Sequence, residues 1–274
     1  MMRKISFMLT MLLVCVMMIA QNKPVITDSE KTLNSQWGGK RVAYLGDSMT
    51  DPNTKVTDKW YWQYLKELMN IDYVVYARSG FQWDGMYEKA KELIAEKKDS
   101  VDAIFIWAGT NDYNHSIIIG DFFAETIEKV NYNGKDTFRK HRTPIMSDAT
   151  FCGRINKTLS LLKENYPDKQ IIILTPTHRG DFVAGSTNVQ PNENYANGIG
   201  LYHEAYVETL KKAGIYWSVP VIDLHALSGI FPVSDAFLPY CAGETDRLHP
   251  NAKGHYRIAK TIQYQLLALP SNFQ

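Results

Sequence analysis

Three side chains of the sequence could together carry out nucleophilic catalysis: Ser48, His249 and Asp246. A serine hydroxyl is a weak nucleophile until an imidazole takes its proton, and the imidazole needs a carboxylate that fixes its tautomer and stabilises its cation. Asp246 lies three residues before His249, so one turn of chain can bring the carboxylate and the ring together. Ser48 is distant in the sequence, and only the fold can bring it to this pair.

Hydrogen-bond donors for the developing negative charge can also be identified. An attacked carbonyl oxygen needs donors that are already in place, and the candidates are the backbone amides of Ser48 and Gly80 and the side-chain amide of Asn111. Ser48 ends the string GDS and Asn111 lies in the string GTND, each directly after an apolar run. We interpret the neighbouring Asp47 and Asp112 as loop residues that accept hydrogen bonds, not as catalytic acids.

Elements of two kinds must position these groups. Short apolar runs bounded by turn residues predict buried parallel strands, and they cover 42–45, 72–77, 103–108, 170–174 and 219–223. Apolar residues at helical spacing lie between them and predict helices from Trp60 to Leu68, with Asp58 as cap, and over 86–97, 151–166, 195–213 and 251–267. This alternation predicts an α/β domain, a three-layer α/β/α sandwich with a five-stranded parallel sheet.

Three stretches fit no regular element: 117–147, 177–194 and 225–245. Long loops of this kind inside a domain are usually lids or other functional excursions. Ligands bind at the carboxyl edge of open parallel sheets. We therefore expect these loops to rim the edge that carries the catalytic groups.

The order of the polar motifs resembles the SGNH hydrolases, also called the GDSL esterase and lipase family. The resemblance extends from Val42 to the final helix and implies the flavodoxin-like fold of that family. It rests on the strings GDS, Ser79-Gly80, GTND and DRLHPN. It implies that Ser48 is the nucleophile, that His249 and Asp246 complete a triad, and that Ser48, Gly80 and Asn111 form the oxyanion hole. Met49 and Ser79 depart from the residues common in the family, but neither removes a reacting group.

The amino end predicts export. A basic start at Arg3-Lys4 precedes an apolar run from Ile5 to Ala20, which is typical of a signal peptide over residues 1–20. A retained membrane anchor is the alternative, but the run is shorter than the roughly 20 apolar residues of a spanning helix. Lipid anchoring at Cys15 is a minor alternative. Residues 21–40 are then expected to be a flexible tether and 41–274 the hydrolase domain, with no membrane span in the mature chain.

Composition limits the partners. The chain has 274 residues and a formal charge of +1, and its basic residues are scattered among acidic ones, which argues against nucleic acid as a partner. No spacing of His, Cys, Asp and Glu indicates a metal site, and serine hydrolysis requires no cofactor; we expect neither. Cys152 and Cys241 could pair in an oxidising compartment, although two buried free thiols are favoured.

The sequence therefore predicts an exported serine esterase that works through an acyl-enzyme. We expect an acetyl ester on a carbohydrate as substrate, because Phe81, Trp83 and Tyr113, and also Trp62, lie close to the motifs and could stack on a sugar ring. The same aromatic residues could equally be core.

Several alternatives remain at this stage. One is a lipase or lysophospholipase-type acylhydrolase, and another is a carbohydrate-binding relative without catalysis. A nucleotide or flavin binder is disfavoured, because Asp47 and Asp51 would repel a phosphate and no glycine-rich loop is present. The oligomeric state is left open.

Overall fold

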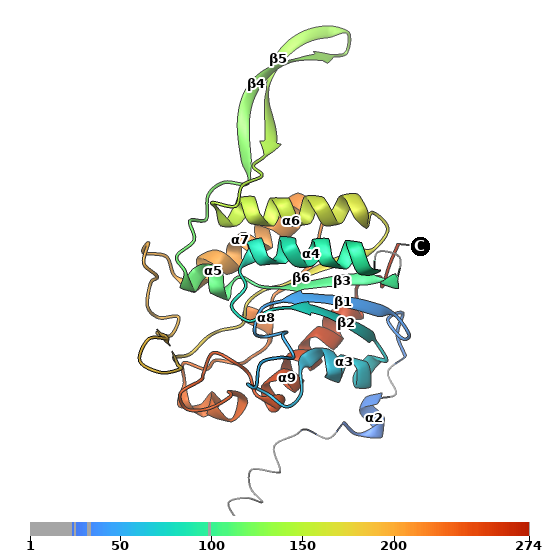
Figure 1. Ribbon diagram of the computed structural model, residues 1–274. Helices are drawn as coiled ribbons and strands as arrows, with labels where there is room; N and C mark the ends of the chain where they lie inside the picture. Colours follow the sequence, from blue (N-terminus) through green and yellow to red (C-terminus); the bar gives the residue numbers. More distant parts are fainter. Residues whose placement is uncertain (1–23, 25, 32–33, 98–99, 274) are drawn as a thin grey trace, which may run out of the picture.

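The computed structural model describes residues 24, 26–31, 34–97 and 100–273, and a five-stranded sheet runs through its centre (Figure 1). The expected signal peptide at 1–20, with Ala20 and Cys15, lies outside the described residues, as do positions 21–23 of the expected tether.

All neighbouring strands of the central sheet are parallel, and their order is β2-β1-β3-β6-β9. The strands are β1 (Arg41–Gly46), β2 (Asp72–Ala77), β3 (Ala103–Trp107), β6 (Gln170–Leu174) and β9 (Val221–Ile222). Val42 in β1 pairs with Tyr73 on one side and with Ala103 on the other. The first strand therefore lies inside the sheet, with its carboxyl end beside that of β3. The predicted α/β fold is confirmed.

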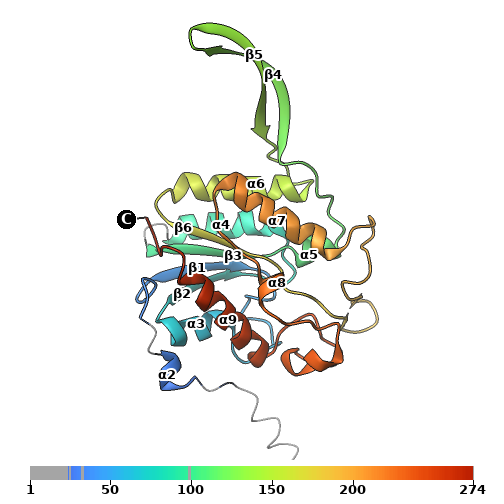
Figure 2. The ribbon, with the colours of Figure 1, turned by 180° about the vertical axis from the view of Figure 1, so that it is seen from behind.

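Helices cover both faces of this sheet (Figures 1 and 2). One face packs against α3 (Tyr61–Met69) and α9 (Ala252–Leu266), and the other against α4 (Trp83–Lys97), α6 (Phe151–Asn165) and α7 (His203–Trp217). Successive strand residues point to opposite faces. Tyr44 and Phe105 accordingly join the core under α3 and α9, whereas Leu45 and Ile104 join the core under α4 and α6.

Short elements lie in the connections between these layers. They are α2 (Asp28–Lys31), α5 (Thr110–Asn114), α8 (Leu224–Leu227), the 3₁₀ helix η2 (Asp235–Tyr240), β7 (Phe182–Val183) and β8 (Val189–Gln190). The loops expected at 177–194 and 225–245 thus contain the small β7–β8 hairpin, α8 and η2.

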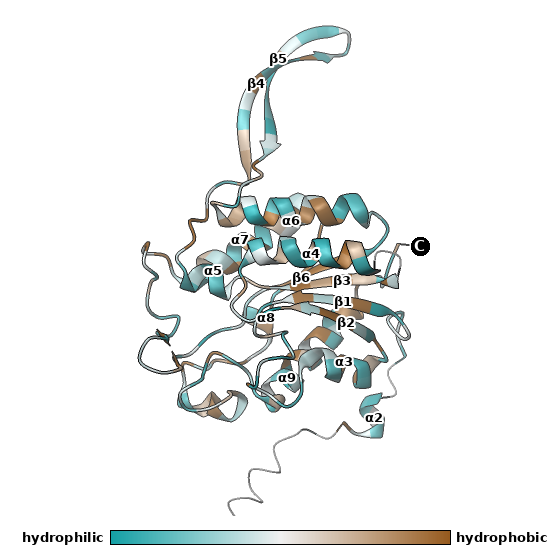
Figure 3. Ribbon diagram, viewed as in Figure 1, coloured by the Kyte–Doolittle hydropathy of each residue, from teal (hydrophilic) through white to brown (hydrophobic). Residues whose placement is uncertain are grey.

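The stretch 117–147, expected to be an irregular loop, contains a long β-hairpin instead. Strands β4 (Phe123–Tyr132) and β5 (Lys135–Pro144) pair over their whole length and project from the domain (Figure 1). Figure 3 shows hydrophilic residues over much of this arm, in contrast to the apolar central strands. Both faces of the hairpin are exposed, so its sequence lacks the alternation of a half-buried strand.

Two helices begin later than the prediction places them. The first helix begins at Tyr61 rather than under an Asp58 cap, and the side chain of Gln63 accepts the N–H of Trp60 at 2.9 Å. The helix expected at 195–213 is α7, which begins only at His203. A turn precedes it, in which the side chain of Asn197 accepts the N–H groups of Ile199 and Leu201.

The end of the expected tether packs against the domain. Trp37 is fully buried, and its indole N–H donates to the carbonyl of Leu266, the last residue of α9, at 2.8 Å and to that of Leu269 at 3.1 Å. Ile26 is also buried in the core on that side. The description of 21–40 as a flexible tether is therefore wrong for these residues, since a single large aromatic side chain was overlooked among polar neighbours.

Both cysteines of the described chain are free and buried, as favoured by the sequence. Burial raises the pKa of Cys152 to about 12 and that of Cys241 to about 11, so neither thiol is ionised at neutral pH. Among the residues that the structure describes, none of the helices has the length and apolar character needed to cross a bilayer.

Candidate active site

Ser48 lies in a tight turn at the carboxyl end of β1. The carbonyl of Asp47 accepts the N–H groups of both Thr50 and Asp51, at 3.0 Å each. Gly46 is required before this turn, because a Cβ there would lie 2.3 Å from the Thr50 hydroxyl oxygen. The serine itself is only 6% exposed.

The structure brings Ser48 together with His249 and Asp246. Nε2 of His249 lies 2.9 Å from Oγ of Ser48, and Nδ1 of the same ring lies 2.9 Å from both carboxylate oxygens of Asp246. A proton on Nδ1 then faces the carboxylate, and Nε2 is left to accept the serine proton. This arrangement can deprotonate a hydroxyl at the moment it attacks.

The segment that carries His249 is held by neighbouring loops. The carbonyl of His249 accepts the N–H of Ala242 at 2.8 Å, and the N–H of Arg247 donates to the carbonyl of Asp181 at 2.9 Å. The ring of Phe182 packs edge-on against the imidazole, with 5.3 Å between ring centroids. These contacts fix both the position and the orientation of the imidazole ring of His249.

The expected donors lie in the same region as Ser48. The side-chain amide of Asn111 donates to the carbonyl of Phe81 at 3.0 Å and to Asp47 at 3.3 Å, which ties the ends of β1 and β3 to the loop after β2. Gly80 has φ +80°, a conformation that favours glycine. Within the described part of the chain, the backbone N–H groups of Ser48 and Gly80 have no hydrogen-bond partner.

A family model for GDSL-like lipases and acylhydrolases matches residues 44–257. The chain belongs to this family. The resemblance inferred from the motifs is thereby confirmed, and family membership identifies the protein as an ester-hydrolysing enzyme that acts on small-molecule esters. No curated protein sequence gives a match.

Solved structures share the fold of this GDSL-like hydrolase. A protein from Lactobacillus plantarum is 24% identical with a TM-score of 0.64, and the match covers 84% of this chain and 97% of that one. A possible lipase from Chitinophaga pinensis is 20% identical with a TM-score of 0.61, covering 83% and 97%. A catalytic mutant of an acetylxylan esterase from Geobacillus stearothermophilus is 17% identical with a TM-score of 0.51, covering 84% and 94%.

Two buried carboxyl groups, those of Asp47 and Asp112, are sequence neighbours of Ser48 and Asn111 in the candidate site of this GDSL-like hydrolase. Burial raises the pKa of Asp47 to about 6, although the N–H of Met49 and the nearby imidazole of His249 oppose the rise. Burial likewise raises the pKa of Asp112 to about 7, against the opposing effect of Arg154, whose guanidinium lies 3.1 Å away. Both side chains accept hydrogen bonds, Asp47 from the N–H of Met49 and the amide of Asn111, and Asp112 from the N–H of Trp83, in agreement with the role expected for them.

The aromatic residues near the motifs mostly belong to the core. Trp83 has no exposed surface and its indole donates to the carbonyl of Ala108, whereas Trp62 and Tyr113 are 4% and 3% exposed. A fully buried ring offers no face to a substrate, so the expectation that Trp83 stacks on a sugar is wrong. Phe81 is half-buried and does line a surface hollow.

This hollow, of about 590 Å³, begins at Gly80 and was not foreseen from the sequence. Its lining is mostly polar or charged: Gly80, Phe81, Gln82, Asp84, Gly85, Tyr87, Glu88, Asp148 and Lys157. The signal that could have found it is the spacing of Asp84, Tyr87 and Glu88, which places them on one face of α4. The predicted helix starts only at Met86, so the prediction lacks the first turn of α4, which carries Asp84.

Proposed function

We propose that the chain is a serine esterase in which Ser48 is the nucleophile, His249 the general base and Asp246 the partner that orients the ring. The contact of 2.9 Å between Nε2 of His249 and Oγ of Ser48 carries this proposal. It is the distance at which a proton can pass from the hydroxyl to the ring.

The reaction proceeds in two halves. Oγ of Ser48 attacks the ester carbonyl carbon while its proton moves to Nε2 of His249, and a tetrahedral oxyanion forms. When the oxyanion collapses, the bond to the alcohol breaks and the leaving alcohol takes the proton from His249. A water molecule, deprotonated by the same imidazole, then attacks the acyl-enzyme, and collapse of that second intermediate returns the proton to Ser48 and releases the acid.

We assign the oxyanion hole to the backbone N–H groups of Ser48 and Gly80 and the side-chain amide of Asn111. The free backbone N–H groups of Ser48 and Gly80 support this role, since donors fixed in advance stabilise the oxyanion without reorganisation. The two amide hydrogens of Asn111 are donated to Phe81 and Asp47, so one of them would turn to the oxyanion while the other keeps the amide in place.

For the substrate we propose an acetyl ester on a carbohydrate. The hollow beside Gly80 is lined by carboxylates, amide and phenol groups, which bind sugar hydroxyls well and a long acyl chain poorly. The fold shared with an acetylxylan esterase agrees with this choice. Export of the protein, as its amino end predicts, would bring it to such a polymer.

Kinetics on two ester series test the proposal. Acetylated xylo-oligosaccharides should be hydrolysed, and p-nitrophenyl acetate should be preferred over p-nitrophenyl octanoate. A preference for octanoate would favour the lipase alternative. Labelling by a fluorophosphonate that persists in Ser48→Ala would overturn the assignment of the nucleophile.

Variants of the hollow test the sugar site separately. Tyr87→Ala and Glu88→Ala should raise KM for the acetylated oligosaccharide several-fold and leave p-nitrophenyl acetate hydrolysis unchanged. Glu208→Ala, an exposed carboxylate on α7 outside the hollow, is the matched control. Equal effects of the two hollow variants on both substrates would count against this site.

A further inference from the structure

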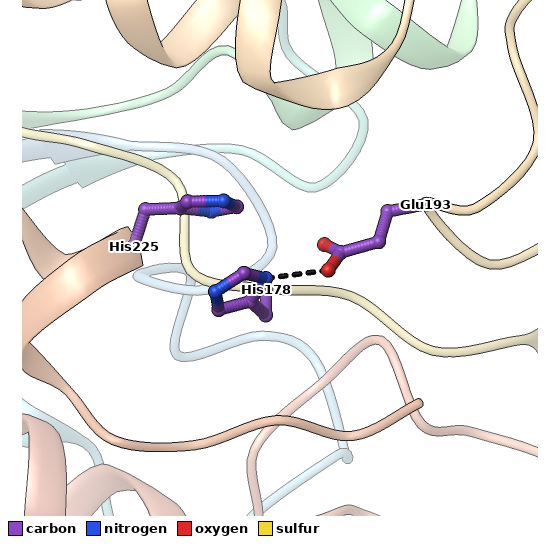
Figure 4. A group of neighbouring side chains, drawn as sticks. All are labelled: His178, Glu193 and His225. Carbon is purple, nitrogen blue, oxygen red and sulfur yellow. Dashed lines mark hydrogen bonds and ion pairs between the residues drawn. The ribbon is translucent and has the colours of Figure 1, made fainter. Parts of the chain in front are cut away.

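Three side chains from three separate segments of the chain meet near the carboxyl edge of the sheet, outside the triad (Figure 4). His178 follows β6, Glu193 precedes α7, and His225 lies in α8. The nitrogen or oxygen atom that each can offer lies within 4.8 Å of the others. Figure 4 shows the carboxylate of Glu193 directed at the ring of His178, and the ring of His225 above the ring of His178.

These groups already contact one another. Nδ1 of His178 is hydrogen-bonded to Glu193, and the rings of His178 and His225 lie 3.6 Å apart between centroids. A third imidazole, that of the fully buried His203, places its Nδ1 3.6 Å from the second oxygen of Glu193. Its ring centroid is 5.6 Å from that of His225.

Several nitrogens in this cluster have no hydrogen-bond partner. Among the described residues they are both ring nitrogens of His203 and Nδ1 of His225. Leaving a buried polar atom without a partner typically costs about 1–3 kcal/mol, so such atoms call for an explanation. A cation accepts nitrogen lone pairs, so an ion bound by His225 would satisfy its Nδ1.

The charges of the cluster also suit a cation. The carboxylate of Glu193 accepts the N–H of Arg179 at 2.9 Å and contacts the imidazoles of His178 and His203. A carboxylate and neutral imidazoles are the forms of these side chains that bind metal ions. The guanidinium of Arg179 is engaged by Thr110 and Gln190.

We propose that His178, Glu193 and His225 bind a Zn²⁺ ion, with His203 beside them. Two imidazoles and one carboxylate are a common zinc ligand set, and it leaves a fourth position open. Zinc–ligand bonds of about 2.0–2.2 Å require the donor atoms to be closer together than they are here, which rotation of the side chains can achieve. The sequence carries no sign of this site, because its residues are far apart in the chain and form no local motif.

A bound ion would join loops that also hold the triad. The N–H of Arg179, next to one ligand, donates to Glu193, and the N–H of Gly180 donates to the carbonyl of Arg247 at 3.1 Å. Arg247 lies two residues before His249. Zinc should therefore raise the thermal stability of the protein, since a ligand that binds only the folded state stabilises it.

The test uses the full chain, freed of metal by a chelator and then dialysed against Zn²⁺. We expect one equivalent of zinc per chain and a rise in Tm that the chelator reverses. His225→Ala and Glu193→Gln should each weaken binding more than 100-fold. His141→Ala, which removes an exposed imidazole from the hairpin, should bind as the wild type does, and so should His249→Ala.

Circular dichroism checks that the variants fold, and fluorophosphonate labelling of Ser48 does so for the variants that keep His249. If Glu193→Gln fails to fold, His225→Ala and His178→Gln carry the test. Absence of stoichiometric zinc in the wild type would overturn the proposal. Loss of zinc in His249→Ala, with retention in His225→Ala, would move the ion to the triad and equally overturn it. Neither result depends on whether the protein is an esterase.

Discussion

Both carboxylate oxygens of Asp246 lie 2.9 Å from Nδ1 of His249, and one of them also accepts the backbone N–H of His249 at 3.0 Å. One carboxylate therefore fixes both the ring and the chain from which the ring extends. This double attachment makes Asp246 the residue on which the tautomer of His249 depends.

Asp246→Asn should lower kcat on the order of 10³- to 10⁴-fold, because an amide no longer holds the proton on Nδ1. KM should change little. Steady-state kinetics on p-nitrophenyl acetate measure the effect, and Asp235→Asn, an exposed carboxylate of the same loop region, is the control. A tenfold loss or less in Asp246→Asn would mean that this carboxylate does not orient the base.

Ser48→Ala and His249→Ala should each abolish nearly all turnover, and the double variant should be no worse than either single one. Residues that act as one catalytic unit are not additive. Single-turnover assays of the three variants measure this. If the loss of turnover in the double variant equalled the product of the two single losses, a shared proton transfer would be contradicted.

Asn111→Ala should lower kcat roughly 100- to 1000-fold, the usual effect of removing one oxyanion donor. KM should stay close to that of the wild type, because the amide acts on the transition state. Asn133→Ala, at the exposed tip of the β4–β5 hairpin, is the matched control. An increase in KM with unchanged kcat would instead assign Asn111 to substrate binding.

Asp47 should make stability depend on pH. Its pKa is raised from 3.8 to about 6 in the folded state, so it favours folding below pH 4, and this contribution is lost as pH rises through 6. Relative to wild type, Asp47→Asn should therefore gain up to about 3 kcal/mol in unfolding free energy between pH 4 and pH 7.

Urea unfolding at several pH values measures this difference, with the exposed Asp136→Asn as a control that should run parallel to wild type. Asp47→Asn should also lose activity, because the side chain of Asn111 donates to the carboxylate of Asp47. A difference in stability that does not vary with pH would contradict the raised pKa.

Trp37→Ala should destabilise the protein by about 3–5 kcal/mol, as truncation of a buried aromatic residue does. It also leaves the carbonyls of Leu266 and Leu269 without the indole N–H. Thermal unfolding measures the loss against Asn34→Ala, which is exposed in the same segment. An unchanged Tm in Trp37→Ala would mean that this segment does not contribute to the fold.

The sequence predicted the four longer strands to within about one residue at each end, because a strand buried on both faces is a continuous apolar run. It also predicted that Ser48, Asp246 and His249 lie together, since Asp246 and His249 are close in the chain and the GDS string follows the first strand. Each of these patterns lies within a short stretch of sequence, so it can be recognised without knowledge of the fold.

Features that depend on packing were not accessible in the same way. Trp83 and Phe81 are both aromatic and lie two residues apart, yet one is fully buried and the other lines the hollow. The grouping of His178 with His225 arises only when the ends of β6 and β9 become neighbours in the sheet. No spacing rule along the chain contains that information.

The β4–β5 hairpin leaves the domain and returns to it at adjacent points, since Phe123 pairs with Pro144 and the N–H of Ile145 donates to the carbonyl of Phe122 at 2.9 Å. An insertion whose two ends meet puts no strain on the chain at either junction. Evolution or protein engineering can therefore shorten, extend or exchange the β4–β5 hairpin while the catalytic domain keeps its own geometry.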